Sequence, residues 1–146
     1  MHKVFGLKEN VEYLHREGAY LIPIEGNKVG VIKTSKGFFF LGGGVEPSED
    51  HISCLERECL EEAGLSVSVK EKVCSAETYT KLPEIGYFHP IQTYYIGQVI
   101  DKISVQTEED HLFLWVEYEE LKGNMFAEMQ NWALEMCMSI KDRAEE

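Results

Sequence analysis

Four carboxylates crowd one short stretch of the sequence, RECLEEAG at residues 57–64 and the position before it. Glu58, Glu61 and Glu62 lie within five residues of one another, and Glu56 precedes them. Like charges on neighbouring turns of a helix repel, so the cluster is unfavourable unless a cation lies nearby. Several carboxylates, with a backbone carbonyl and water, form the oxygen ligand set that Mg²⁺ or Mn²⁺ prefers. The alternative is a solvated helix face, which is the commoner interpretation of an exposed Glu–Glu pair alone.

A helix is expected to position these carboxylates, from about Ser48 as N-cap to Ala63, with Gly64 as a left-handed C-cap. At about 100° per residue the three carboxylates share one arc, roughly opposite an apolar arc that we expect to face the core. Just upstream, the glycines at 42–44 end an apolar strand and let the backbone approach a ligand closely. The apolar arc consists of Ile52, Leu55, Cys59 and Ala63.

The rest of the chain is predicted to form strands and one further helix. Alternation and β-branched residues predict strands, and glycines and prolines predict the turns between them. Many strands and two helices, without strict alternation, predict a mixed α+β domain. The expected strands are 19–25, 29–34, 37–41, 65–78, 91–100 and 111–118, with a turn at 26–28, a loop at 81–90 and a C-terminal helix at 125–141.

Two apolar groups have alternative interpretations. The methionines and the tryptophan of the C-terminal helix could form a ligand surface, although core packing or a dimer contact is the commoner role. An aromatic group could stack on a base, although alternating strand aromatics are more often core residues. The aromatic group is Tyr79, Tyr87, Phe88, Tyr94 and Tyr95.

Bulk properties limit the class of protein. A chain of 146 residues fits one domain, residues 1–146. It has no apolar run long enough to span a membrane and no signal peptide, so we expect a cytoplasmic protein. The four cysteines lack metal-site spacing and are expected to be reduced. A net charge of −12 disfavours a long nucleic acid but allows a small phosphorylated ligand bound through a divalent metal.

Residues 43–65, GGVEPSEDHISCLERECLEEAGL, resemble the signature of the Nudix hydrolases. The family pattern is a Gly, five residues, a Glu, seven residues, then Arg-Glu-apolar-x-Glu-Glu-x-Gly-apolar. One departure is Cys59, where the family usually has Leu, Ile or Val, and a cysteine keeps that position small and apolar. Leu41, where Pro is frequent, and Ser48, where Gly is frequent, also differ from the commonest form of the family, and neither is expected to take part in the chemistry. Every fixed position is matched, by Gly43, Glu49, Arg57, Glu58, Glu61, Glu62 and Gly64, with Leu65 as the last apolar residue.

The resemblance implies an α/β/α sandwich with a mixed sheet between helices. It also implies hydrolysis of a nucleoside diphosphate linked to another group, with Mg²⁺ or Mn²⁺ as cofactor. By position, Glu58 and Glu62 would be the main metal ligands, and Glu61 a further ligand or a base. The Gly42 carbonyl would complete the ligands, while Glu49 and Arg57, with Gly43, would support the site. A bound metal would neutralise charge that develops on the pyrophosphate.

Other functional features remain open in the sequence. The resemblance implies a further acid from a loop before a strand of the site, and within the run TEEDHLFLWV we favour Glu109 as a ligand or general base. A solvated acidic loop explains that run about equally well. The substrate could be a modified nucleoside triphosphate, a nucleotide sugar or, less attractively, a capped RNA end. A non-catalytic nucleotide-binding module of the same fold is the alternative function, and a homodimer is possible.

Overall fold

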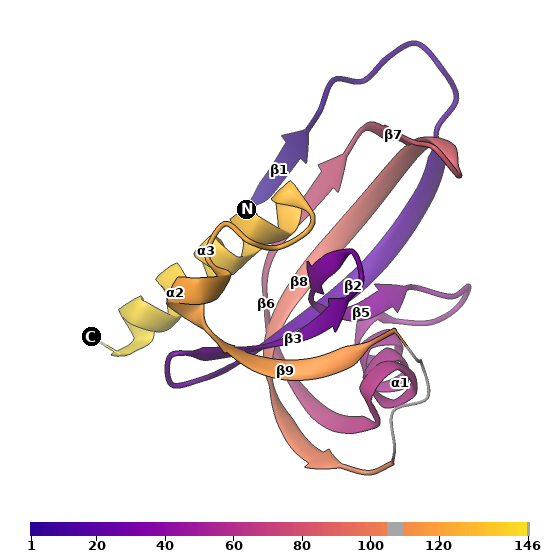
Figure 1. Cartoon of the computed structure of the whole chain (residues 1–146). Coiled ribbons are helices and arrows are strands. Elements are labelled where there is room, and N and C mark those ends of the chain that lie inside the picture. Colours follow the sequence, from indigo (N-terminus) through magenta and orange to yellow (C-terminus); the bar gives the residue numbers. More distant parts are fainter. Residues whose placement is uncertain (105–109, 146) are drawn as a thin grey trace.

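The computed structural model describes residues 1–104 and 110–145 of the chain (Figure 1). The sheet follows the order β1-β6-β8-β2-β3-β4, while β5 pairs with β2, β7 with β8 and β9 with β3. Neighbours β1 and β6, and β2 and β8, run parallel, and the other pairs run antiparallel. The predicted mixed sheet and α+β class are confirmed. The elements are β1 (His2–Phe5), β2 (Leu14–Glu25), β3 (Lys28–Thr34), β4 (Gly37–Phe39), β5 (Leu41–Gly44), α1 (His51–Ala63), β6 (Leu65–Thr78), β7 (Thr80–Leu82), β8 (Gly86–Lys102), β9 (Leu112–Glu117), α2 (Tyr118–Leu121) and α3 (Glu128–Glu145).

Strand β2 divides the core into two layers, because successive side chains of a strand point to opposite faces of the sheet. Ala19 and Leu21 belong to one buried cluster, which includes residues of α1. Ile22 belongs to the other cluster, which includes residues of α3. The two helices therefore cover opposite faces of the sheet (Figure 1). This arrangement is the expected α/β/α sandwich.

Helix α1 begins later than predicted, because its N-cap is Asp50 and not Ser48. The Asp50 carboxylate accepts a hydrogen bond from the Ser53 N–H at 2.7 Å. Ser48 has a φ of +67°, in the left-handed region, so it belongs to the preceding turn. Gly64 ends the helix with a φ of +68°, as predicted. The boundary was misplaced because two nearby polar residues are both good capping residues.

The buried arc of α1 is also rotated relative to the prediction. Ile52 is 51% exposed and does not face the core, whereas Cys54 is fully buried. The Cys54 thiol contacts the carbonyl oxygens of Gly43 and Gly44 at 3.7 and 3.6 Å, which turns this side of the helix toward β5. The other predicted core residues of the helix, Leu55, Cys59 and Ala63, are buried.

The strand predicted at 37–41 is two strands with different partners. Strand β4 pairs with β3, and β5 pairs with β2, with the buried Phe40 between them. The glycine triplet is therefore part of β5 and does not follow a strand. Gly42 has a φ of +145°, and a Cβ there would lie 2.1 Å from the Ala19 carbonyl oxygen. Only glycine fits this approach of β5 to β2.

Smaller differences concern the other elements. The predicted loop at 81–90 is a tight hairpin, because β7 and β8 pair directly around a turn at residues 83–85. Helix α3 begins at Glu128, so Phe126 precedes it and is 56% exposed. The inner face of α3 is core, as favoured, with Met129, Ala133 and Cys137 buried. All four cysteines are buried and unpaired. None of the described helices is long and apolar enough to cross a membrane.

Candidate active site

The carboxylates of α1 face β5, and Glu62 is the most enclosed of them. Glu62 is 8% exposed, and its Oε1 accepts a hydrogen bond from the Gly42 N–H at 3.3 Å. Its Oε2 lies 2.9 Å from the Nδ1 of His111, the residue just before β9. A carboxylate buried in this way needs hydrogen bonds or a cation, because its desolvation is unfavourable. Glu62 is therefore held between a glycine backbone and an imidazole.

Glu58 lies one turn earlier and against the next glycine of β5. A Cβ added at Gly43 would lie 2.6 Å from the Glu58 carboxyl carbon. Glycine at this position is therefore required for the carboxylate to reach the strand. Glu61 is more open, with a side chain 56% exposed. The helix thus presents three carboxylates in graded exposure along the glycine strand.

Arg57 ties this helix to the loop between β5 and α1. Its Nε donates to Glu49 Oε2 at 2.7 Å and its Nη2 to Glu49 Oε1 at 2.9 Å. The same Nη2 donates to the Gly44 carbonyl at 3.1 Å. A bidentate pair of this kind fixes both partners geometrically. Hydrogen bonds from Arg57 lower the pKa of Glu49 to about 2.

Arg57 also contacts two carboxylates, Glu58 and Glu61, for which the family resemblance implies a metal-binding role. Its Nη1 lies 2.7 Å from Glu58 Oε1 and 3.2 Å from Glu61 Oε2. These contacts supply positive charge where the helix carries its negative cluster. The hydrogen bonds to Glu49, followed by those to Glu58, raise the pKa of Arg57 above its usual value. In the part of the chain that the structure describes, no three acidic, histidine or cysteine side chains converge as a preformed metal site.

The donor set nevertheless fits a hard divalent cation. It consists of carboxylate oxygens beside a glycine backbone, and no cysteine sulfur lies among the residues that line the space beside them. Such an oxygen donor set suits Mg²⁺ or Mn²⁺. Gly43 leaves the space beside the strand that the Glu58 carboxylate occupies. The site could bind a metal after Glu58 and Glu61 exchange their contacts with Arg57 for the cation.

These residues border a cavity of about 550 Å³, here called the acidic cavity. Its wall also carries two cations, Arg16 and Lys36, and neither forms an ion pair with a residue that the structure describes. The cavity therefore combines a negative side with a positive one. It is lined by Arg16, Tyr20, Ile32, Thr34, Lys36, Phe39, Phe40, Gly42, Gly43, Glu58, Glu61, Glu62, Asp110 and His111.

The acidic run before β9 contributes Asp110 to this cavity. Its carboxylate accepts hydrogen bonds from the Ser35 hydroxyl at 2.8 Å and from the Ser35 N–H at 3.2 Å. These bonds lower the Asp110 pKa and tie the start of β9 to the turn between β3 and β4. The favoured acid of this run, Glu109, lies outside the described residues. His111 follows that acidic run directly in the sequence, but nothing in the sequence indicates its contact with Glu62.

A second cavity, of about 410 Å³ and here called the aromatic cavity, adjoins the first. The two share Arg16, Tyr20 and Phe39. Burial raises the pKa of Tyr20 to about 12, so its hydroxyl is a neutral hydrogen-bonding group at the boundary. The aromatic cavity is lined by Phe5, Arg16, Gly18, Tyr20, Phe39, Thr78, Thr80, Leu82, Phe88, Pro90, Gln92, Phe126, Ala127, Glu128 and Met129.

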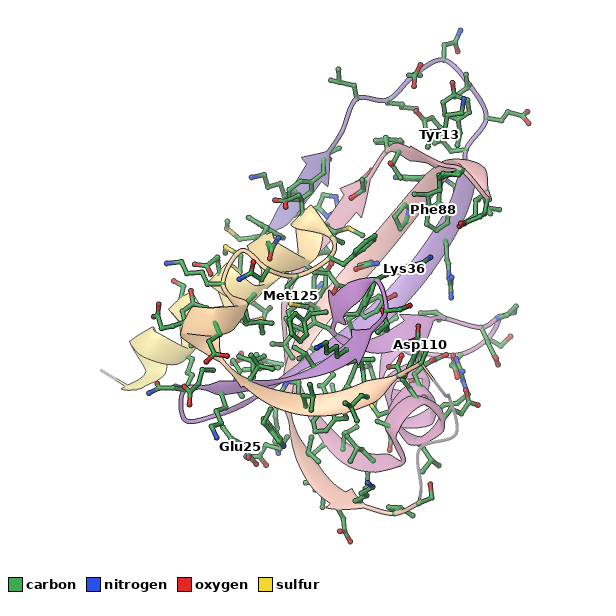
Figure 2. All side chains as sticks on the ribbon, viewed as in Figure 1. Tyr13, Glu25, Lys36, Phe88, Asp110 and Met125 are labelled. Carbon is green, nitrogen blue, oxygen red and sulfur yellow. The ribbon has the colours of Figure 1, made fainter. Side chains whose placement is uncertain are left out.

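Of the five aromatics that could have stacked on a base, Phe88 lines the aromatic cavity. Tyr94 is a core residue, and the Tyr95 hydroxyl pairs with His51 at 2.8 Å. Figure 2 shows the labelled Phe88, Lys36 and Asp110 in that order from top to bottom of the view. The cavity's other aromatics come from separate strands and loops, so periodicity along one strand could not have identified them.

Comparisons with known proteins agree with this fold. The family model described as NUDIX domain matches residues 14–136. The E. coli ORF135 protein has a similar structure, with a TM-score of 0.63 and 24% identity over 88% of this chain and 92% of that one. A MutT NUDIX hydrolase from Burkholderia pseudomallei reaches 0.69, with 17% identity over 84% and 98%. A MutT protein from Bacillus halodurans also reaches 0.69, with 14% identity over 82% and 80%. Among proteins of curated function, none matches.

Proposed function

Because the chain belongs to the Nudix hydrolases, which act on diphosphate bonds, we propose that it is a metal-dependent pyrophosphohydrolase. Its substrate would be a nucleoside diphosphate linked to another group, such as a modified nucleoside triphosphate or a nucleotide sugar. Water would attack phosphorus and release two phosphorylated products. One observation carries the proposal: the carboxylates of Glu58 and Glu62 lie against the glycine backbone of β5, on the wall of a cavity that also holds cations.

Glu58, Glu61 and Glu62, with the Gly42 carbonyl, would hold the cation. Mg²⁺ or Mn²⁺ would supply Lewis-acid stabilisation of charge on the pyrophosphate oxygens. Without a cation, these carboxylates would repel the substrate, whose phosphates are also negative. The metal therefore explains how an acidic site could accept an anion. Arg57 and Glu49 would support the site by holding the loop before α1 on the helix.

Arg16 and Lys36, the two cations that line the acidic cavity, would bind the part of the pyrophosphate that the metal does not neutralise. Arg16 lines both cavities, so its guanidinium would contact a phosphate that lies between them. Guanidinium groups bind phosphate oxygens in pairs, which orients as well as attracts. The Tyr20 hydroxyl at the same boundary is a neutral donor. The diphosphate would then lie across the boundary, with its attached nucleoside in the aromatic cavity.

Glu61 and Glu62 are the proposed groups for moving the proton of the attacking water, together with Glu109. Glu61 is exposed enough to exchange its contact with Arg57. The imidazole of His111 would fix the orientation of the Glu62 carboxylate through the contact at 2.9 Å. A base must lie within hydrogen-bond reach of the proton that it accepts.

The test is a turnover screen with purified protein over nucleoside triphosphates, nucleotide sugars and dinucleoside polyphosphates. Products are separated chromatographically, so that the cleaved bond is identified. Hydrolysis should cease with EDTA and return with excess Mg²⁺ or Mn²⁺. Metal-independent hydrolysis would contradict the mechanism. Saturable nucleotide binding without turnover on any compound would favour the binding module instead.

A further inference from the structure

Gln92 is a polar side chain on the wall of the aromatic cavity, and its orientation is fixed by a chain of hydrogen bonds. This series of hydrogen bonds begins at the backbone of Phe40, whose N–H donates to Gln130 Oε1 at 3.1 Å. A backbone N–H can only donate, so Gln130 must present its oxygen to Phe40. Gln130 is 1% exposed and cannot exchange this partner for water.

The amide nitrogen of Gln130 is therefore left to donate to the next member of this hydrogen-bond series, Gln92. Gln130 Nε2 donates to Gln92 Oε1 at 3.1 Å. The Tyr94 hydroxyl donates to the same oxygen at 2.6 Å. Burial raises the Tyr94 pKa well above its usual 10, which keeps that hydroxyl a donor. Both donors fix Gln92 with its oxygen toward the core.

The amide nitrogen of Gln92 is then a donor without a protein acceptor. None of the residues that the structure describes accepts a hydrogen bond from it, and the side chain lines the cavity. A donor in an apolar enclosure requires either water or a ligand acceptor, because leaving it unpaired is unfavourable. The surrounding aromatic side chains, among them Phe39, Phe88 and Phe126, favour a flat ligand group.

We propose that Gln92 is a specificity-determining residue, whose Nε2–H donates to a hydrogen-bond acceptor on a nucleobase bound in the aromatic cavity. This inference rests on the proposed function, in which the diphosphate lies across Arg16. A base has both features that the cavity matches, a flat aromatic body and acceptor atoms at its edge. A wholly apolar substituent would leave the Gln92 donor unpaired and is disfavoured.

The N-terminal segment contributes to the same enclosure. Phe5 on β1 lies on the cavity wall and packs against Trp132 of α3, with ring centroids 6.3 Å apart. It precedes residues 14–136, the part of the chain that the family model matches. The enclosure around the proposed base is thus partly built by a segment outside the matched region.

The test compares Gln92→Glu with Gln98→Glu, the same substitution on the same strand. Glutamate at 92 keeps an oxygen for Gln130 and Tyr94 but replaces the donor by an acceptor. Gln98 is exposed and lines neither cavity, so its variant controls for the added charge. Binding of AMP, GMP, CMP and UMP, which have no diphosphate bond to hydrolyse, is measured by calorimetry with Mg²⁺ present. Ribose 5-phosphate, which lacks a base, is the matched ligand control.

At least one of the four nucleotides should bind more tightly than ribose 5-phosphate to the wild-type protein. Gln92→Glu should weaken that binding about tenfold, whereas Gln98→Glu should leave it unchanged. Ribose 5-phosphate should bind the two variants equally. Equal nucleotide affinities of the two variants, or no preference for a nucleotide over ribose 5-phosphate, would overturn the inference.

A second measurement needs no variant. The side-chain amide protons of Gln92 are assigned by NMR in the wild-type protein. The chemical shifts of these protons should change when a nucleotide that binds is added, and they should not change with ribose 5-phosphate. Unchanged chemical shifts with a nucleotide that binds would overturn the inference. Both measurements are independent of turnover, so a failure of the proposed hydrolysis would be seen separately in the EDTA and turnover assays.

Discussion

The acidic wall of the first cavity and the aromatic cavity beside it are built from the sequence in opposite ways. The acidic wall comes from neighbouring segments, since the glycines of β5 and the carboxylates of α1 all lie between Gly42 and Glu62. The aromatic cavity collects side chains from Phe5 to Met129, on several strands and on the segment before α3. The acidic wall, here called the local region, is defined by spacing along the chain. The aromatic cavity, here called the distant region, is defined by tertiary contacts. We infer that the chemistry is encoded locally, and the choice of substrate by distant parts of the chain.

The largest expected effect comes from the local region. Glu58→Gln and Glu62→Gln each remove a charge proposed to hold the cation, so kcat should fall by about 10²- to 10³-fold. The measurement is steady-state hydrolysis of the best substrate from the screen, with circular dichroism to verify folding. Glu56→Gln is the control, because Glu56 is exposed on the same helix and lines neither cavity. Full activity in either variant would refute its assignment to the metal.

A single methyl group should also disable the local region. In Gly43→Ala the new Cβ would lie 2.6 Å from the Glu58 carboxyl carbon and displace that carboxylate. Because misplacing a reacting group by about 1 Å can cost about 10²-fold, we expect a loss of that order in kcat.

Gly44→Ala is the matched control for this displacement. Its Cβ would lie 3.0 Å from the Arg16 Nε, the end of a flexible side chain that can move away. The loss in kcat should therefore be smaller than at Gly43, and a displacement of Arg16, the proposed phosphate contact, should appear in KM instead. If both variants lose the same activity, the clash with Glu58 is not the cause.

The same contrast explains what could be predicted from the sequence. The α+β class, the helix that carries the carboxylates and its end at Gly64 follow from periodicity and from one glycine, whereas the mixed sheet was implied by the family resemblance. The contact between His111 and Glu62 could not be predicted, because it depends on how β9 pairs with β3. The aromatic cavity was missed for the same reason, since residues far apart in the sequence meet only after the sheet forms.

The distant region should control affinity more than rate. Phe88→Ala removes an aromatic surface from the aromatic cavity, so KM for a nucleoside substrate should rise about tenfold with kcat little changed. Tyr87→Ala is the control, because the neighbouring residue on a strand points to the other face, and Tyr87 does not line the cavity. A fall in kcat at constant KM would show that Phe88 acts on the chemical step. It would contradict the assignment of chemistry to the acidic wall and of substrate affinity to the aromatic cavity.

The smallest effect should appear in stability, and it tests whether the local region is held by its ion pair. The pKa of Glu49 is about 2, below its usual 4.5, chiefly because of hydrogen bonds from Arg57. A carboxylate whose pKa is lowered by folding stabilises the fold above its unfolded pKa, and this contribution is lost as the pH falls through the folded pKa.

Glu49→Gln lacks that contribution at every pH. Its unfolding midpoint should therefore lie below that of the wild type at neutral pH, and the two should converge as the pH falls from about 4.5 to about 2. Denaturant unfolding over this range measures the difference, with Glu56→Gln as a variant that should show no such convergence. A gap that stays constant with pH would mean that the substitution at Glu49 perturbs packing, and that the ion pair with Arg57 does not hold the loop.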